Sequence, residues 1–501
     1  MKNIRIKIIT SGILWIIFST PLVLAENPAL KQDLINQSDI ETGDLGFDEI
    51  LKAGLLVYTT PFNHLDGYGD GPPDSSIVRS LPGNRPGLQT KSMPFLRVNG
   101  LDAQTCLECH SVLSRASIPM KFSVGGFGGA NNNAIFLPKN IDVSDSKGHG
   151  FASFDGRFIN PPFNFGGGGI ELLAKEMTVE LHRIKEKAQQ APVGTIFKLN
   201  TKGVSFGNVS SLGDGEIELD IASKGFAIDD DLIVRPFGRK GEFATIRAFD
   251  QGAMQFHFGM QASEVVGEGV DADNDGVSDE VTVGEMSALH VFLASLPRPR
   301  ETKKSRNARA GKKLFTNIGC SRCHIPKLVT NESDLPISFP EVPTDPWANA
   351  FISLDLSEQP MGFRKRQNSE VDESLSADLK RLGFKKRHNH NSGVDVSLFA
   401  DLKRHHMGKE LAESTANKEM DPYFTTARLW GVADTAPYLH DGRAMTLSEA
   451  IIAHGGEAKP ESLNFINLSE NQRHQLIDFL QTLRTPKPRK INSFIKKIQK
   501  K

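Results

Sequence analysis

Two short stretches, CLECH (106–110) and CSRCH (320–324), contain every cysteine of the 501-residue chain. Each reads Cys-x-x-Cys-His, which is the attachment signature of c-type haem. Two thiols on one helical turn can reach both vinyl groups of a porphyrin, and the histidine that follows then lies under the iron. We therefore predict two covalently bound c-type haems. The attaching residues are Cys106, Cys109, Cys320 and Cys323, and the proximal iron ligands are His110 and His324.

Three other uses of four cysteines compete with haem. In an exported chain they could form two disulfides. They could bind zinc, but the paired motifs of zinc ribbons are usually about 15–20 residues apart, whereas these lie at 106–109 and 320–323. They could also be thiol–disulfide redox motifs. None of these uses requires a histidine directly after the second cysteine in both copies, so haem is the preferred interpretation.

The first 25 residues have the pattern of a secretory signal peptide. A basic start is followed by a mostly apolar run at 8–24, and Val23 and Ala25 supply small residues before a cleavage point. An uncleaved N-terminal anchor is the alternative, because the run approaches membrane-spanning length. We expect export, most simply to a bacterial periplasm, and no membrane span after removal of residues 1–25.

Composition excludes several classes of protein. Hydrophobic residues make up 39% of the chain, so it is neither disordered nor a polytopic membrane protein. Lys and Arg number 59 and Asp and Glu number 60, giving a formal charge of -1. A chain balanced in this way is not a general nucleic-acid binder. Its length favours two or three domains.

Both haem motifs lie in a similar frame. Helical patterns precede them at 46–62 and 303–319, and amphipathic patterns that end in proline follow at 281–300 and 468–488. This frame describes a cytochrome c unit, so the fold class is predicted to be mainly α. The predicted domains are a haem domain at 26–300, a second haem domain at 301–488 and a basic, solvated tail at 489–501.

The first unit is predicted to be elaborated. Residues 66–104 and 120–170, including GGGG at 166–169, are rich in Gly, Pro and Asn and are expected to form long loops. Residues 171–190 have a helical pattern. Alternating residues between 194 and 260 predict a small antiparallel β insertion. A polar, charged insertion at about 328–425 interrupts the second unit.

The acidic stretch DADNDGVSD (271–279) resembles the start of a calcium-binding loop. It places acids at loop positions 1, 3, 5 and 9 and a glycine at position 6. Position 12 is Thr282 rather than Glu, although Glu280 or Glu285 could substitute; an acidic turn that caps the next helix is the alternative. The possible calcium ligands are Asp271, Asp273, Asp275 and Asp279.

The segment TTARLWGVADTAPYLHDGRAMTLSEAIIAHGGEA (425–458) resembles the C-terminal haem domain of the di-haem cytochrome c peroxidase superfamily. It is most similar to the di-haem oxidoreductase branch, also called predicted thiol oxidoreductases. The stretches DLKRHHMG (401–408) and GLDAQTCLECH (100–110) fit the same branch, and FDGRF (154–158) fits it faintly. The resemblance covers both motifs and the last third of the chain, but it does not explain residues 194–260.

The resemblance implies a distal ligand for the second haem. In the superfamily that ligand follows the His of the His-Asp-Gly motif by fourteen positions, and counting from His440 gives His454. A helix-end residue is the alternative interpretation of His454. His440 and Asp441 are expected to hold a loop or a propionate, and Trp430 is expected either between the haems or in the core. Weaker ligand candidates are His405, His406 and Met407.

The resemblance also implies that the first iron is the open, catalytic one. A distal acid would then move protons during O–O cleavage. Glu171, Glu176 and Glu180 are candidates for that acid, although each fits a solvated helix charge better. His182, His257 and Met260 could instead close the site as a sixth ligand, and the sequence does not choose among them.

The predicted function is that of a periplasmic, peroxidase-like di-haem oxidoreductase. One haem relays electrons and the other binds peroxide or dioxygen, with a redox protein such as a small cytochrome or cupredoxin, or a quinol-linked donor, as partner. A small organic substrate is a further possibility. A non-catalytic di-haem electron carrier is the alternative, but it would not need 501 residues or long pocket loops.

Overall fold

The computed structural model places most of the chain. It describes residues 27–30, 35–69, 89–90, 93–94, 103–110, 133–142, 151–220, 227–365, 393–414 and 420–500. The predicted signal peptide at 1–25 lies outside these ranges. Within them, no helix combines the length and the apolar character needed to cross a bilayer.

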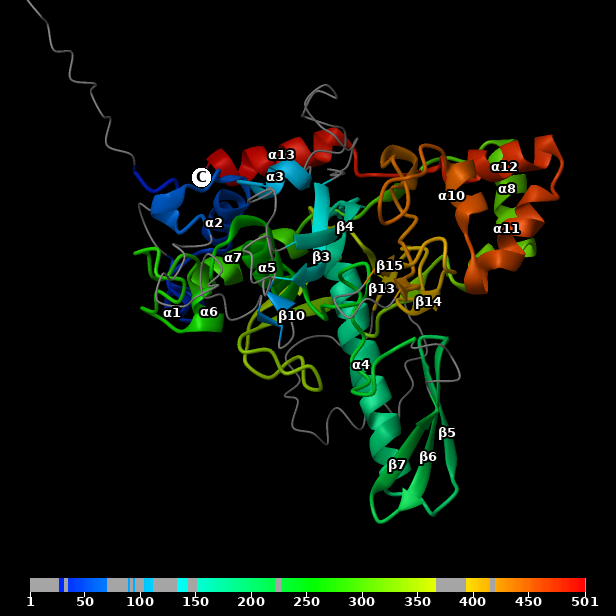
Figure 1. Ribbon diagram of the computed structural model, residues 1–501, viewed down its shortest axis with the longest axis horizontal. Helices are drawn as coiled ribbons and strands as arrows, with labels where there is room; N and C mark the ends of the chain where they lie inside the picture. The colour runs from blue at the N-terminus through cyan, green and yellow to red at the C-terminus, as the bar shows by residue number, and fades with distance from the viewer. Residues whose placement is uncertain are drawn as a thin grey trace, which may run out of the picture.

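Two helix pairs repeat along the chain, one around each haem motif. Helix α2 (Phe47–Thr59) packs against α7 (Val283–Ala294), and α8 (Arg306–Asn317) packs against α12 (Glu470–Leu480). The leading and closing helices predicted from the sequence are thereby confirmed. The first pair lies in the larger body of the molecule, and the second lies with α10 (Leu447–Ala453) and α11 (Lys459–Ile466) at its far end (Figure 1).

Each helix pair is closed by a glycine at the crossing point. A Cβ atom added to Gly54 in α2 would overlap the carbonyl of Ala288 in α7. A Cβ atom added to Gly311 in α8 would overlap the carbonyl of Gln475 in α12. Only glycine allows such a close approach of two backbones. The two units therefore share a detail of packing as well as an order of elements.

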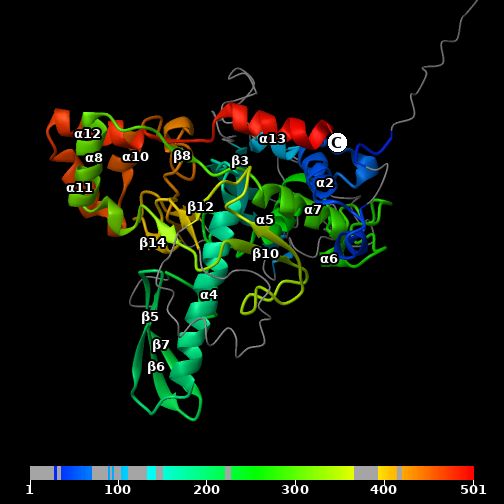
Figure 2. The ribbon, with the colours of Figure 1, turned by 180° about the vertical axis from the view of Figure 1, so that it is seen from behind.

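Helix α4 (Gly167–Gln189) and a three-stranded sheet form an arm that projects from the body (Figures 1 and 2). The sheet is an antiparallel meander of β5 (Ile196–Thr201), β6 (Val204–Gly213) and β7 (Glu216–Asp220). The predicted β insertion is thus present, but it ends near residue 220.

The remainder of the predicted insertion is not β structure. Residues expected to alternate as strands form helix α5 (Ile246–Ala253), which continues into a π-helical turn, η3 (Met254–Phe258). Thr245 starts α5 by accepting a hydrogen bond from the Ala248 N–H, and the helix then packs on α7. This cap and this packing outweigh the alternating pattern of the sequence.

Two regions predicted to be loops are ordered differently. Strands β3 (Asn133–Asp142) and β4 (Phe151–Ile159) form an antiparallel hairpin. The glycine run at 166–169 starts α4 rather than a loop. Gly166 has φ of +78°, and a Cβ atom on Gly168 would lie 2.5 Å from the Ala294 carbonyl oxygen. The run is needed for a tight contact between α4 and the end of α7.

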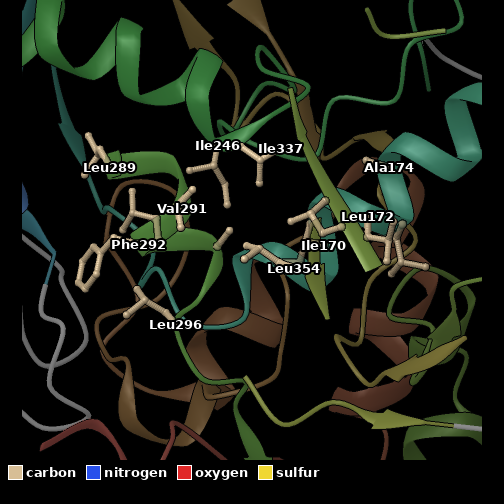
Figure 3. Close-up of a cluster of buried hydrophobic side chains, with 14 of the residues drawn as sticks. Ile170, Leu172, Ala174, Ile246, Leu289, Val291, Phe292, Leu296, Ile337 and Leu354 are labelled. Atoms are coloured by element: carbon tan, nitrogen blue, oxygen red, sulfur yellow. The ribbon is translucent and has the colours of Figure 1, made fainter. Parts of the chain in front are cut away.

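The insertion in the second unit packs against the first unit. Ile337 and Leu354 lie beside Ile170 and Ile246 in one buried cluster (Figure 3). A separate, smaller cluster lies between α8 and α12. The insertion forms short antiparallel pairs. They are β9 (Leu328–Val329) and β12 (Arg364–Lys365) on either side of β13 (Val394–Val396), β10 (Asp334–Ser338) with β11 (Ala350–Asp355), β14 (Arg404–His406) with β17 (Tyr423–Thr425), and β15 (Glu413–Ser414) with β16 (Met420–Asp421).

The C-terminal segment is a helix and not the solvated tail that its composition suggested. Helix α13 (Pro488–Lys500) returns to the first unit and packs on α2. Phe494 and Ile498 are buried, and the Phe494 ring stacks on Phe292 of α7 at 6.2 Å. The apolar positions of the tail therefore face the core.

The fold is a mixture of helices and small antiparallel sheets rather than mainly α. The insertions account for most of the strands. The remaining described elements are α1 (Gln37–Glu41), η1 (His64–Asp66), β1 (Gln89–Thr90), β2 (Met93–Pro94), α3 (Cys106–Cys109), α6 (Ser263–Val266), β8 (Arg300–Glu301), η4 (Cys320–Arg322), η5 (Val432–Asp434), α10 (Leu447–Ala453), η6 (Gly456–Ala458), α11 (Lys459–Ile466) and β18 (Leu483–Arg484).

Candidate haem-binding sites

The first Cys-x-x-Cys-His motif forms a single helical turn, α3, held against α2. Thr105 caps the turn, and its hydroxyl also donates a hydrogen bond to the Tyr58 carbonyl at 3.2 Å. The phenol of Tyr58 donates to the His110 carbonyl at 2.9 Å. Both cysteines therefore lie on one turn, with His110 directly after it, as thioether attachment requires.

The ring of His110 has a fixed orientation. Its Nδ1 lies 2.7 Å from the Pro162 carbonyl oxygen, and a carbonyl can only accept, so Nδ1 carries the proton. Burial lowers the pKa of His110 to about 4, which keeps the ring neutral. A neutral imidazole whose Nδ1 donates to a carbonyl has Nε2 free for a metal, as is common among histidine ligands.

A cavity that is partly open to solvent lies against this motif. Its walls are mostly apolar, which suits a porphyrin. They include Phe163, Phe165, Ile170, Phe237, Ile246, Phe249, Phe258 and Leu293, together with the motif residues Cys106, Cys109 and His110.

Helix α5 and the π-helical turn η3 supply two polar groups to the same cavity. His257 in η3 lies close enough to His110 for its charge to lower the pKa of that ring. Asp250 in α5 is only 7% exposed, and its Oδ2 makes no hydrogen bond within the described residues. Burial, and next the charge of Glu171, raise the pKa of Asp250 well above its usual range, which favours the protonated form of its carboxyl.

Glu171 is deeply buried instead of being a solvated helix charge. It accepts hydrogen bonds from the Ile246 N–H at 3.0 Å and from His290 Nε2 at 2.9 Å, and it pairs with Lys175 at 2.7 Å. Burial alone would raise its pKa, but His290 and Lys175 outweigh burial and lower it. Glu171 does not line the cavity, so it is the neighbour of the candidate acid and not the acid itself.

Glu176 and Glu180 also form ion pairs, and these pairs connect α4 to the sheet of the arm. Lys202, in the turn between β5 and β6, pairs with Glu176 at 2.7 Å and with Glu180 at 3.1 Å. Two further candidates, His182 and Met260, are absent from the cavity wall as well. Of the sixth-ligand candidates, His257 alone faces the cavity among the described residues.

At the second motif, His324 and His454 face each other. Their ring centroids are 6.3 Å apart. A histidine nitrogen lies about 2.0–2.1 Å from a bound first-row metal, so two rings on opposite sides of one ion have centroids about 6 Å apart. His324 Nδ1 donates to the Phe399 carbonyl at 3.2 Å, and His454 Nδ1 donates to the Ala450 carbonyl at 2.7 Å. Both Nε2 atoms are left for an ion between the rings.

Local structure explains where His454 lies. Thr446 and Glu449 form a capping box that starts α10, and His454 is the residue at which this helix ends. Burial lowers the pKa of His454, and it lowers the pKa of His324 to about 4. Two neutral imidazoles therefore face each other, which is the protonation state that metal binding requires.

The weaker ligand candidates have other partners. His405 Nε2 lies 2.8 Å from Asp401, and its Nδ1 lies 2.9 Å from Glu457. Although burial favours the neutral ring, hydrogen bonds to Asp401 and to the Cys323 sulfur raise its pKa to about 11. An imidazolium held by two carboxylates is not available to iron. His406 Nδ1 accepts from the Gly408 N–H at 3.2 Å.

The loop that contains His440 joins the two units. Asn160 donates from its backbone N–H to the His440 carbonyl at 2.8 Å and from its side chain to the Pro437 and Leu439 carbonyls. The His440 ring stacks on Phe424 at 4.3 Å. Because Asn160 is two residues from Pro162, this loop is fixed next to the wall of the first cavity.

Trp430 lies between the two candidate sites. Its backbone N–H donates to the Leu398 carbonyl, next to the residue that holds His324. On the other side, a Cβ atom on Gly166 would lie 2.8 Å from the indole ring. Arg428, two residues earlier, reaches the wall of the first cavity. Burial lowers the pKa of Arg428 to about 10, and its guanidinium donates to the Pro236 carbonyl at 2.9 Å.

The acidic loop brings three of its four predicted ligands together. Oxygen atoms of Asp271, Asp273 and Asp275 all lie within 4.8 Å of one another. Gly276 has φ of +94°, as the sharp turn at position 6 requires. Asp279 instead accepts hydrogen bonds from the Ser263 hydroxyl and the Gly269 N–H.

Neither glutamate that could have completed the loop is oriented toward it. Glu280 accepts from the Gln261 N–H at 2.7 Å. Glu285 forms a capping box with Thr282 at the start of α7. Any cation in this loop would therefore be held by three aspartates, backbone carbonyls and water.

Two of the alternatives for the cysteines, disulfides and a shared zinc site, are not seen in the geometry of the described residues. All four lie within the described residues, and they form no disulfide. Cys106 and Cys109 line the first cavity, whereas Cys323 lies beside His405 in the second unit, so the two motifs do not form one zinc site.

Comparison with protein families gives one match. Residues 383–483 match the family described as “Di-haem oxidoreductase, putative peroxidase”. This segment is therefore similar to the di-haem oxidoreductases. The matched segment contains His405, Trp430, His440 and His454 but neither Cys-x-x-Cys-His motif. The resemblance stated from residues 425–458 is thereby confirmed for this part of the chain.

Two further comparisons add little to this result. No curated protein matches the chain. Among solved structures, hydrazine synthase of Kuenenia stuttgartiensis, pressurised with 20 bar xenon, is similar at 16% identity, over 59% of this chain and 78% of that one. The TM-score is 0.24, so this similarity carries no argument about the fold or the function of the chain.

Sequence reasoning missed three residues of the first cavity: Asp250, Tyr58 and Arg428. Asp250 lies in the predicted β insertion, so the sequence did not predict the helix in which it is found. A Thr at 245 followed by apolar residues at 246 and 249 is a helix-start signal that could have corrected this. Arg428 was inside the segment that carries the resemblance, but nothing in the sequence shows that it is buried.

Proposed function

We propose that the chain is an exported, peroxidase-like di-haem c-type oxidoreductase. Its first haem would bind peroxide or dioxygen, and its second haem would relay electrons. The observation that carries the proposal is the inequality of the two sites. The second offers a facing histidine pair, and the first offers a cavity with one anchoring histidine and a protonated acid.

The second site supports an electron relay. His324 and His454 would together hold the second haem through its iron, and the iron would then have no position for a substrate. Bis-histidine ligation lowers the reduction potential relative to His/Met ligation. Backbone carbonyls hold both rings, so the chain fixes their orientation with little room for adjustment.

The first site supports peroxide or dioxygen chemistry. Reduction of one peroxide to two waters takes up two electrons and two protons. A haem held here by Cys106, Cys109 and His110 would supply the electrons and bind the peroxide. We assign proton supply within this cavity to Asp250, because it is buried in the cavity wall and its pKa is raised well above the usual range. General acid catalysis of this kind contributes typically about 10²–10⁴-fold.

Trp430 and Arg428 are proposed to serve the connection between the sites. Trp430 packs on Gly166, between the cavity-lining residues Phe165 and Gly167, and its backbone bonds to the segment that holds His324. Arg428 carries a buried positive charge at the wall of the first cavity, which would favour an anionic group such as a haem propionate.

His257 gives the alternative function its one specific support. If this ring closes the first haem as a sixth ligand, both irons are saturated and the chain is a di-haem electron carrier. A spectrum of the purified protein separates the two proposals. A five-coordinate component that binds cyanide or peroxide is expected for the enzyme. Two low-spin haems that bind neither ligand in either oxidation state would favour the carrier.

Variants of three histidines test the assignment. We expect His454→Ala to convert the second haem to a high-spin, ligand-binding form, and His324→Ala to abolish its correct assembly. His257→Ala should increase ligand binding at the first haem if His257 is a sixth ligand. A spectrum that His454→Ala leaves unchanged would remove this histidine from the second haem.

We propose in addition that the acidic loop binds calcium through Asp271, Asp273 and Asp275. Its role would be structural, because the loop precedes α7, which closes the first unit. Titration of the metal-stripped protein with Ca²⁺ should raise its unfolding temperature, and Asp273→Asn should remove the effect. Equal unfolding temperatures with Ca²⁺ and with chelator in the wild type would exclude the site.

A further inference from the structure

Positive charge is concentrated next to the second haem motif. Between Thr302 and Asn331 the sequence contains eight Lys and Arg residues and no Asp or Glu. The chain as a whole is almost balanced, with 59 bases and 60 acids. The eight bases are Lys303, Lys304, Arg306, Arg309, Lys312, Lys313, Arg322 and Lys327.

Helix α8 presents most of this charge on one side. Ala308, Gly311 and Phe315 are its buried positions, and this face packs on α12. The exposed side carries the bases. We call Lys303, Arg306, Arg309, Lys312 and Lys313 the α8 basic face; Lys312 is half-buried and the other four are exposed.

Neighbouring acids do not neutralise the α8 basic face. Glu301 pairs with Lys304, Glu461 of α11 pairs with Arg322, and Asp395 pairs with Lys327 at 3.2 Å. The five members of the face form no ion pair within the described residues. Glu470 and Asp478 are the acids of α12, and neither forms an ion pair with α8 there.

The same face leads directly to the second haem motif. Helix α8 ends at Asn317, and Gly319 with φ of +101° turns the chain into Cys320. The attachment turn itself reaches the surface, because the Arg322 side chain is 67% exposed and both cysteines are only partly buried. A protein bound to the α8 basic face would therefore lie next to the second site.

We propose that the α8 basic face docks an acidic electron-transfer protein that exchanges electrons with the second haem. The inference rests on the proposed function of that haem as the relay. The interfaces of electron-transfer complexes are small and short-lived, and complementary charge mainly raises the association rate of the two proteins. A patch of like charge on a nearly neutral chain, next to the redox motif, has the features that such steering requires.

Two probe proteins that differ in charge test this docking. The first is a lysine-rich mitochondrial-type cytochrome c, and the second is the same cytochrome with its lysines succinylated. Stopped-flow mixing of the dithionite-reduced holoprotein with each oxidised probe gives the rate constant for electron transfer from the second haem to the probe. We expect the acidic probe to react faster, with a rate that falls as ionic strength rises, and the basic probe to show the opposite dependence.

The variant Lys303→Glu, Arg306→Glu, Lys313→Glu removes charge from exposed positions only. It should lower the rate with the acidic probe by about tenfold or more, within the 10–10³ range of electrostatic steering. A matched control reverses three exposed lysines elsewhere, Lys187, Lys198 and Lys496, and has the same net charge. The control should keep the wild-type ordering of the two probes.

Two results would overturn the proposal. One is equal effects of the α8 and control variants. The other is equal rates for the two probes. Equal rates are also expected if the face binds anionic lipid, and sedimentation with phosphatidylglycerol vesicles would then identify that occupant. Reduction by dithionite should be the same in all variants, which excludes damage to the haem. If the wild-type holoprotein reduces no peroxide but still reacts faster with the acidic probe, the proposed enzyme activity is refuted and the docking proposal is retained.

Discussion

Burial of Asp250 is expected to lower the stability of the fold, and the same burial supports its proposed role as proton donor. In the unfolded chain its pKa is about 3.9, and in the folded protein burial raises it well above that value. Below about pH 3.9 the carboxyl is neutral in both states. Above that pH, folding must keep a proton that the unfolded chain releases, so the free energy of unfolding falls with rising pH until the folded pKa is passed.

Replacement of Asp250 by asparagine should therefore separate stability from activity. The introduced amide is neutral at all pH values, so we expect Asp250→Asn to equal or exceed the wild type in stability at pH 7. Peroxide turnover should fall by about 10²–10⁴-fold, the usual contribution of a general acid. Denaturant unfolding and steady-state turnover, each between pH 5 and 8, provide the measurements. An Asp250→Asn variant with wild-type turnover would exclude Asp250 as the proton donor.

The buried cluster beside Asp250 allows a second test. Lys175→Met would leave Glu171 with one fewer charge partner and should destabilise the fold by about 3–5 kcal/mol, as the loss of one member of a buried pair does. The double variant Lys175→Met, Glu171→Gln removes the unpaired charge, and we expect it to recover much of the loss. Chemical denaturation of both variants measures the difference. Equal destabilisation in the two variants would show that packing, and not charge, is what Lys175 provides.

At the scale of the element, burial explains which sequence patterns were informative. The helices around each haem motif were predicted correctly, because apolar positions at helical spacing face one partner helix in each pair. The stretch from Thr245 to Phe258 was predicted to be β structure because its apolar residues alternate. It is helical instead, and its apolar residues contact both α7 and the cavity. The glycine run at 166–169 was predicted to be a loop because glycine is rare inside helices. It starts α4 instead, since it packs against the end of α7, and that contact is too distant in the sequence to be predicted locally.

Helix α13 shows the same limit, and it yields a prediction. Its basic composition suggested a solvated tail, but Phe494 stacks on Phe292, and Phe292 contacts Tyr58. Phe494→Ala should lower the free energy of unfolding by about 3 kcal/mol, the lower end of the cost of removing a buried phenylalanine ring. The exposed Lys496→Ala is the control and should change stability by less than about 0.5 kcal/mol. Similar effects of the two variants would mean that α13 is detached in solution.

At the scale of the whole molecule, the sequence predicted the two haem motifs, their helical frames and the pairing of His324 with His454 in one candidate site. It did not predict that the insertion in the second unit joins the core of the first, because long-range packing leaves no periodic signal. Nor did it place the loop around His440 against Asn160. The units are thus less separate than the repeated motifs suggested, and α13 adds a second connection between them.

This shared core makes Trp430 the side chain on which communication between the sites should depend. Its indole packs on Gly166, which lies between the cavity-lining residues Phe165 and Gly167, and its backbone bonds to the segment that positions His324. The two candidate haems would then be linked through one buried ring, whatever partner delivers the electrons. We expect Trp430→Leu to leave both haem spectra unchanged and to slow electron transfer from the second haem to the first.

Rapid mixing with a substoichiometric reductant, followed at wavelengths that distinguish the two haems, would measure that rate. Trp430→Phe keeps an aromatic ring in the same space and is the matched variant, so it should lie between the wild type and Trp430→Leu. Unchanged transfer in Trp430→Leu, with both spectra intact, would mean that electrons cross by the peptide segment around Asn160 and His440 instead. In that case the Asn160→Ala variant, which removes two side-chain hydrogen bonds to the loop, should slow transfer.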